Sequence, residues 1–89
     1  MMLCRYCLVF GRVQGVAYRM ATRKKAAELA VTGYVRNRDD GSVEVLACGD
    51  AEDVDRLCSW LSSGPVLAQV SRVQCEERAM TKSEQFVIL

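Results

Sequence analysis

The order of apolar patterns along this chain constrains its fold more than any other feature. Stretches of alternating or β-branched apolar residues predict strands, whereas apolar residues that recur every three or four positions predict amphipathic helices. Asp39-Asp40-Gly41 separates two predicted strands and is a strong hairpin signal, because a tight turn needs the positive φ angles that Asp and Gly adopt. The predicted elements are, in order, a strand over 3–10, a helix over 19–31, strands over 34–38 and 42–48, a helix that Asp50 caps and that ends before Gly64, a strand over 70–75, a polar surface turn over 76–84 and a short strand over 86–89.

This order predicts an α+β, ferredoxin-like βαββαβ sandwich, in which an antiparallel sheet carries both helices on one face. The chain has 89 residues, so it has room for a single domain over 1–89. Val43, Val45 and Ala47 alternate along their strand and are expected to face the helices. Gly33 follows the first helix and is the predicted stop signal for it.

The composition excludes several function classes. The chain has no histidine, which removes the commonest general base and the imidazole ligands of zinc sites. The 12 Lys and Arg residues nearly balance the 11 Asp and Glu residues, so the net charge of +1 gives no reason to expect nucleic acid or a membrane surface as a partner. No apolar run is long enough to span a membrane, and Arg5 interrupts the N-terminal apolar stretch, which also lacks the cleavage site of a signal peptide. We therefore expect a cytoplasmic protein.

A loop with two glycines, Gly11 and Gly15, leads into the first predicted helix, and Arg19 lies in the first turn of that helix. A helix N-terminus presents unpaired N–H groups and the positive end of the helix dipole, which together suit an anion. An arginine is unfavourable there, so Arg19 needs another reason for its position. A bound dianion supplies one, because an arginine grips two phosphate oxygens at once. The glycine spacing alone also fits an ordinary strand-to-helix loop.

A second motif ends at the predicted hairpin, where Asn37 precedes the turn. An asparagine there is by itself a common turn initiator. Taken together, however, segments 11–19 and 33–44 resemble the acylphosphatase family. Its signature reads Gly-Arg-Val-Gln-Gly-Val-x-aromatic-Arg, followed by Gly-aromatic-x-x-Asn-x-x-Asp-Gly-x-Val-Glu, and both blocks stand in this chain at matching spacing.

The resemblance implies a role for particular residues. Arg19 corresponds to the phosphate-binding arginine of the family, and Asn37 to the catalytic asparagine that orients the attacking water. The implied phosphate-binding segment, which acts through its backbone N–H groups and the Arg19 side chain, comprises Val13, Gln14, Gly15, Val16, Ala17, Tyr18 and Arg19. Ala17 stands where many members carry glycine, and we expect it to have a negative φ angle, at which alanine costs little.

The resemblance implies an enzyme that hydrolyses the carboxyl–phosphate bond of small acyl phosphates to carboxylate and orthophosphate. The residue inventory agrees, because phosphoryl transfer needs positioning and charge stabilisation more than a strong base. We therefore expect a monomer that uses no metal and no cofactor and that phosphate or sulfate inhibits by competition.

A non-catalytic phosphate- or carboxylate-binding module of the same fold is an alternative, which would need Arg19 but not Asn37. An RNA-recognition motif shares the βαββαβ order, but strand 42–48 has no aromatic residue and carries Glu44.

Cys4 and Cys7 have the spacing of a redox or zinc pair, but residues three apart in a strand point to opposite faces, and no second pair of this kind follows. We expect most of the five cysteines to be small, buried apolar residues in a reducing compartment.

Cys4 and Cys48 are predicted to be close enough to pair, because the first and third strands of this fold are antiparallel neighbours. Both cysteines are expected at the same end of these strands and on the open face, where oxidation would join them. Two free thiols remain the alternative.

Overall fold

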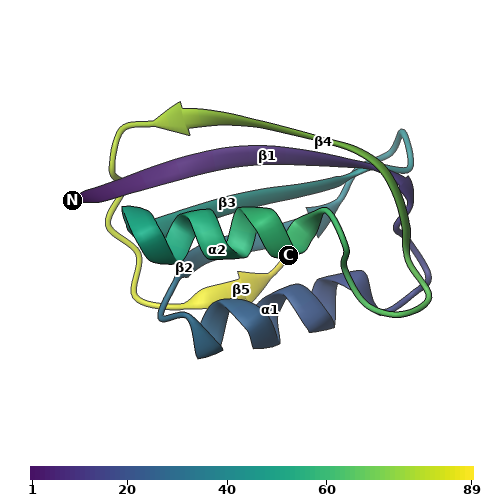
Figure 1. Ribbon diagram of the computed structural model, residues 1–89, viewed down its shortest axis with the longest axis horizontal. Helices are drawn as coiled ribbons and strands as arrows, with labels where there is room; N and C mark the ends of the chain where they lie inside the picture. Colours follow the sequence, from purple (N-terminus) through teal and green to yellow (C-terminus); the bar gives the residue numbers. More distant parts are fainter.

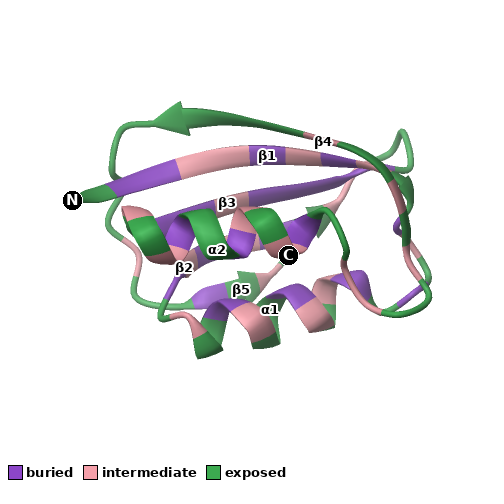
Figure 2. Cartoon of the chain, viewed as in Figure 1, coloured by how far each residue is buried: buried purple, intermediate pink, exposed green.

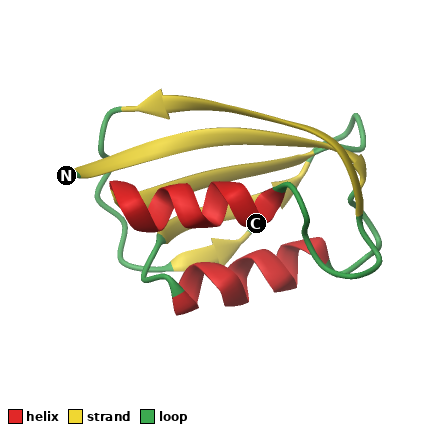
Figure 3. Ribbon diagram, viewed as in Figure 1, coloured by secondary structure: helices red, strands yellow, loops and turns green.

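The computed structural model describes residues 1–89 as one sheet with two helices (Figure 1). Both helices lie on one face of the sheet, as the colouring by secondary structure makes plain (Figure 3). Neither helix is long and apolar enough to cross a membrane. The elements are β1 (Met2–Arg12), α1 (Tyr18–Glu28), β2 (Thr32–Asn37), β3 (Val43–Asp50), α2 (Ala51–Leu61), β4 (Gln69–Arg78) and β5 (Phe86–Ile88).

The strand order across the sheet is β4-β1-β3-β2-β5. The pairs β1–β3, β1–β4 and β2–β3 are antiparallel, which confirms the predicted ferredoxin-like sandwich. The last strand differs from the prediction, because β5 pairs parallel to β2 and makes the sheet a mixed one. This arrangement follows from the path of the chain, which crosses one end of the sheet after β4 and returns along the far edge (Figure 1).

The core lies between the sheet and the helices. Figure 2 colours buried residues purple, and they lie on the inner strands and along both helices. Val43, Val45 and Ala47 are fully buried on the helix side, as their alternation predicts. Asp50 caps α2 as expected, because its side chain accepts a hydrogen bond from the Glu52 N–H. The buried stripe of α1 consists of Tyr18, Thr22 and Ala26, and that of α2 of Val54, Leu57 and Leu61.

The predicted end of α1 is wrong. The helix ends at Glu28 rather than at residue 31, and Ala30 takes a left-handed conformation with φ 56°. Gly33 does not stop the helix but lies inside β2, with φ 131°. A Cβ atom on Gly33 would lie 1.9 Å from the Leu46 carbonyl oxygen, so this glycine lets β2 approach β3 closely.

The predicted surface turn over 76–84 is also wrong at its start. β4 continues through Glu76, Glu77 and Arg78, which pair with Tyr6, Arg5 and Cys4 of β1. Polar residues do not interrupt this strand, because it lies at the edge of the sheet and is largely exposed.

Cys4 and Cys48 are cross-strand partners on the open face of the sheet, and the structure joins them as a disulfide. Both are fully buried although no helix covers that face. The segment after β4 supplies the cover, since the Met80 Sδ lies 3.8 Å from the Cys4 Sγ and the Thr81 N–H donates to that same sulfur at 3.3 Å.

Candidate active site

The loop between β1 and α1 is rich in unpaired hydrogen-bond donors. None of the backbone N–H groups from Val13 to Ala17 donates a hydrogen bond to another protein group. The first N–H groups of α1 have no carbonyl one turn earlier, and neither a capping side chain nor an acidic residue offsets them. Uncapped donors and the positive end of the helix dipole therefore share one location, which is suited to an anion.

Ala17 shapes this donor-rich loop, and its conformation contradicts the expectation from the sequence. Its φ is 61°, in the left-handed region, rather than negative. Left-handed backbone brings the side chain of an L-residue too close to its own peptide group, which costs alanine about 1–2 kcal/mol. The geometry explains why glycine suits this position, and it turns the chain from the loop into the first turn of α1.

Arg19 lies in that first turn and points toward β5. Its guanidinium makes one hydrogen bond, a donation at 3.3 Å to the main-chain oxygen of Leu89 in an exposed environment. The remaining N–H donors of the guanidinium therefore stay available to a ligand.

Asn37 is the last residue of β2, and it approaches the same place from the sheet. Its Oδ1 is buried and has no hydrogen-bond partner in the protein. Buried polar atoms are normally hydrogen-bonded, so an unpaired acceptor is unusual and suits a bound water or ligand group.

A cavity of about 230 Å³ brings these groups together. Six of the eight residues that the sequence singled out line it, joined by two residues that sequence reasoning missed, Met20 of α1 and Ile88 of β5. No signal in the sequence places Ile88 there, because its position depends on the parallel pairing of β5. The six are Val13, Gly15, Ala17, Tyr18, Arg19 and Asn37.

The other two residues of the implied phosphate-binding segment do not line the cavity. Val16 is 7% exposed and belongs to the core. Gln14 turns its side chain toward the β2–β3 hairpin, where its Nε2 donates to the main-chain oxygens of Arg38 at 2.8 Å and Ser42 at 2.9 Å. Gln14 thereby fixes the loop to the hairpin directly beside Asn37.

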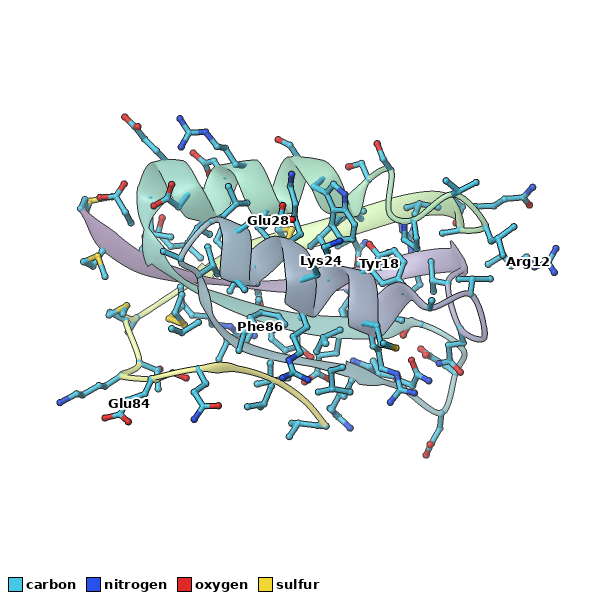
Figure 4. All side chains as sticks on the ribbon, turned by 90° about the horizontal axis from the view of Figure 1, so that it is seen from below. Arg12, Tyr18, Lys24, Glu28, Glu84 and Phe86 are labelled. Carbon is cyan, nitrogen blue, oxygen red and sulfur yellow. A yellow bond between two sulfur atoms is a disulfide. The ribbon has the colours of Figure 1, made fainter.

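Tyr18 anchors the opposite side of the loop. Its hydroxyl donates to the Leu61 carbonyl oxygen at 2.6 Å, and its ring packs against Trp60 with a centroid distance of 6.0 Å. Burial raises the pKa of this phenol well above its ordinary value, so it stays neutral. Figure 4 shows Tyr18 at the start of α1, on the side of that helix that faces the end of α2. The aromatic residue of the motif therefore holds the helix start in place and serves as a structural anchor.

Glu44 closes the second motif, and it lies on the opposite face of the sheet from the cavity. It is 4% exposed and accepts hydrogen bonds from the Tyr34 hydroxyl at 2.5 Å and from Arg36 at 2.9 Å. Burial acts to raise the pKa of this carboxyl, but the hydrogen bonds from Arg36 and Tyr34 outweigh it, and the pKa lies below its ordinary value. Glu44 therefore fastens β3 to the end of β2 that carries Asn37.

The fold and this cavity define a small ferredoxin-like protein with an uncapped, arginine-bearing helix start as its candidate site. A protein-family model described as Acylphosphatase matches residues 5–88. The chain belongs to the acylphosphatase family.

Individual relatives agree with this assignment. The chain is 49% identical over 88 residues to an acylphosphatase of Nitrosococcus oceani, with 99% of each chain covered. Among solved structures, an acylphosphatase from Coxiella burnetii matches with a TM-score of 0.96 at 41% identity, covering 99% of this chain and 93% of the other. The acylphosphatase from Bacillus subtilis matches with a TM-score of 0.94 at 32% identity, covering 98% of both. These matches confirm the resemblance, the fold and the acylphosphatase function predicted from the sequence.

Proposed function

We propose that the cavity at the start of α1 hydrolyses the carboxyl–phosphate bond of small acyl phosphates, with Arg19 and Asn37 as its catalytic residues. The observation that carries this proposal is the convergence of three features on one cavity. These features are unpaired backbone donors, a guanidinium with free N–H groups and a buried, unpaired amide oxygen.

The phosphoryl group lies at the donor-rich loop. The backbone N–H groups of residues 13–18 and the guanidinium of Arg19 bind its oxygens and stabilise the charge that develops on them. A bidentate contact from Arg19 also fixes the orientation of the phosphoryl group.

Asn37 supports the attack. Its Oδ1 accepts a hydrogen bond from a water and holds that water in line with the bond to be broken. The water oxygen forms a bond to phosphorus, and the phosphorus–acyl oxygen bond breaks with its electron pair going to the carboxylate. A phosphate oxygen of the substrate takes the proton from the water, so no histidine is required.

The lining of the cavity is unsuited to a metal ion. It includes no carboxylate, imidazole or thiol, so it offers no ligand set for a divalent cation. We infer metal-free and cofactor-free hydrolysis by a cytoplasmic monomer, with phosphate and sulfate as competing anions.

The second candidate is a non-catalytic phosphate- or carboxylate-binding module of the same fold. It would use the loop and Arg19 but has no need of the buried Asn37 oxygen. The presence of that oxygen in the cavity therefore favours the enzyme.

Hydrolysis of benzoyl phosphate in the presence of EDTA tests the proposal. Turnover that EDTA leaves unchanged and that phosphate inhibits competitively supports it. Phosphate binding without turnover would instead support the binding module, and a requirement for magnesium would contradict the metal-free mechanism.

A further inference from the structure

Three of the five cysteines gather outside the lining of the candidate active site, on three different elements. They are Cys7 of β1, Cys58 of α2 and Cys75 of β4, and their sulfur atoms all lie within 4.8 Å of one another. The sulfurs of Cys7 and Cys58 are 3.6 Å apart. In the structure Cys7 and Cys75 form a disulfide and Cys58 is a free thiol. We call Cys7, Cys58 and Cys75 the three-sulfur cluster.

Rigid elements hold the cluster together. Cys7 and Cys75 are direct cross-strand partners of β1 and β4, so their side chains leave the sheet on the same face. That face carries α2, which packs against β1 and β3 and lies in front of the sheet in Figure 1. An ion pair between Arg5 of β1 and Asp55 of α2 stands beside the cluster, two residues before Cys7 and three before Cys58. The three sulfurs therefore stay close whether or not two of them are bonded.

We propose that, after reduction of the Cys7–Cys75 disulfide, the three-sulfur cluster binds a thiophilic d¹⁰ cation such as Zn²⁺ or Cu⁺. Thiolates select this class of ion. Zinc–sulfur bonds of about 2.3 Å in a tetrahedral site place the sulfurs about 3.8 Å apart, close to the separation of Cys7 and Cys58. Three protein ligands leave a fourth position for a solvent or external ligand.

Metal binding requires that the Cys7–Cys75 disulfide is first reduced. A dithiol or phosphine reductant supplies two electrons, and two protons from solvent complete the thiols of Cys7 and Cys75. The cation then displaces three protons and forms three metal–sulfur bonds. Zn²⁺ with three thiolates carries a net charge of −1, and the Arg5 guanidinium, which is paired with Asp55, is the positive group beside it. Oxidation restores the disulfide and removes two of the three ligands, so only the reduced protein binds the cation.

The cluster is accessible from one side. Cys7 is fully buried and Cys58 is partly buried, but Cys75 is exposed on the edge strand. The metal site is separate from the acylphosphatase function, because no cysteine lines the active-site cavity.

Titration with Cd²⁺ tests the proposal, because cadmium thiolates have an ultraviolet charge-transfer band whose intensity reports the number of bound sulfurs. The parent protein is Cys4→Ala/Cys48→Ala, which removes the two cysteines outside the cluster. After phosphine reduction without oxygen, we expect one cadmium per chain with three thiolates. Separate competition by Zn²⁺ and by Cu⁺ then shows which ion the site prefers.

Cys58→Ser in this parent is the decisive variant, because Cys58 takes no part in the disulfide. We expect the charge-transfer intensity to fall by about a third. We expect the affinity for cadmium to fall by more than the roughly tenfold that loss of an outer-shell partner of a metal site costs. Cys75→Ser, at an exposed position, is expected to lower the charge-transfer intensity and the cadmium affinity in the same way.

Benzoyl phosphate hydrolysis serves as the check on folding. If the double-alanine parent does not hydrolyse benzoyl phosphate, the same comparison is made in the wild-type background. An unchanged band and affinity in Cys58→Ser would overturn the proposal, as would equal binding by oxidised protein.

Discussion

The side-chain amide of Gln14 donates a hydrogen bond to the main-chain oxygen of Arg38 over 2.8 Å, and so joins the anion-binding loop to the hairpin that follows Asn37. A second bond from the same nitrogen reaches Ser42 at 2.9 Å. The two halves of the candidate site come from different motifs, and the Gln14 side chain links them directly.

Gln14→Leu is therefore expected to lower activity without removing any group that touches the substrate. Losing two hydrogen bonds is expected to reduce the free energy of unfolding by about 1–3 kcal/mol. Each carbonyl oxygen keeps one backbone donor, since the Gly41 N–H donates to Arg38 and the Arg38 N–H donates to Ser42. Displacement of Asn37 from the loop is expected to lower kcat on the order of tenfold or more. Gln74→Leu, at an exposed position of β4, is the matched control. A kcat equal to that of the wild type would refute the positioning role of Gln14.

Ala17→Gly is expected to stabilise the protein. Glycine relieves the left-handed strain at φ 61°, and the greater freedom of glycine in the unfolded chain offsets part of the gain. The net increase in the free energy of unfolding is expected to be up to about 1 kcal/mol, measured by urea denaturation. Ala21→Gly, inside α1, provides the opposite control and is expected to cost about 1 kcal/mol. If Ala17→Gly destabilises as much as Ala21→Gly, the conformation assigned to Ala17 is wrong.

These two residues also show where the sequence stops being informative. The Asp-Gly hairpin and the alternation of Val43, Val45 and Ala47 predict the sheet correctly, because both signals are local. The bonds of Gln14 end on main-chain oxygens more than twenty residues away, which carry no side-chain signature. The φ of Ala17 likewise depends on how the loop enters α1, since alanine usually avoids that conformation.

The register of distant strands is likewise not predictable from the sequence. Ile88 reaches the cavity because β5 pairs parallel to β2, and Cys75 meets Cys7 because of the register between β4 and β1. Neither register follows from the composition of such exposed edge strands. The pairing of Cys4 with Cys48 does follow from the sequence, because both lie on central strands whose order the fold determines.

The Cys4–Cys48 pair is expected to form a disulfide when the protein is oxidised in air. The bond closes a loop with a sequence separation of 44, and by the chain-entropy model it adds at most roughly 4 kcal/mol to the free energy of unfolding. Activity is expected to stay unchanged, because neither cysteine lines the cavity. Peptide mapping under non-reducing conditions provides the check. A Cys4 peptide that is linked to another cysteine, or to none, contradicts the pairing.

Asn37→Ala is expected to separate catalysis from binding. The substitution removes the proposed partner of the attacking water, so kcat for benzoyl phosphate falls strongly while phosphate still binds at the loop and Arg19. Because the Oδ1 of Asn37 has no partner in the protein, its loss is expected to leave the free energy of unfolding unchanged or slightly higher. Loss of phosphate binding with an unchanged kcat would show that Asn37 does not orient the water.

The kinetics of Arg19→Lys test the central claim most directly. Lysine keeps the positive charge but lacks the fork that grips two phosphate oxygens, so kcat/KM for benzoyl phosphate is expected to fall at least about 100-fold, or about 3 kcal/mol in transition-state stabilisation. Inhibition by phosphate is expected to weaken with it. Arg23→Lys, one turn further along α1 and outside the active-site cavity, serves as the control and is expected to keep the wild-type rate. An Arg19→Lys variant that retains most of the wild-type kcat/KM would contradict the account.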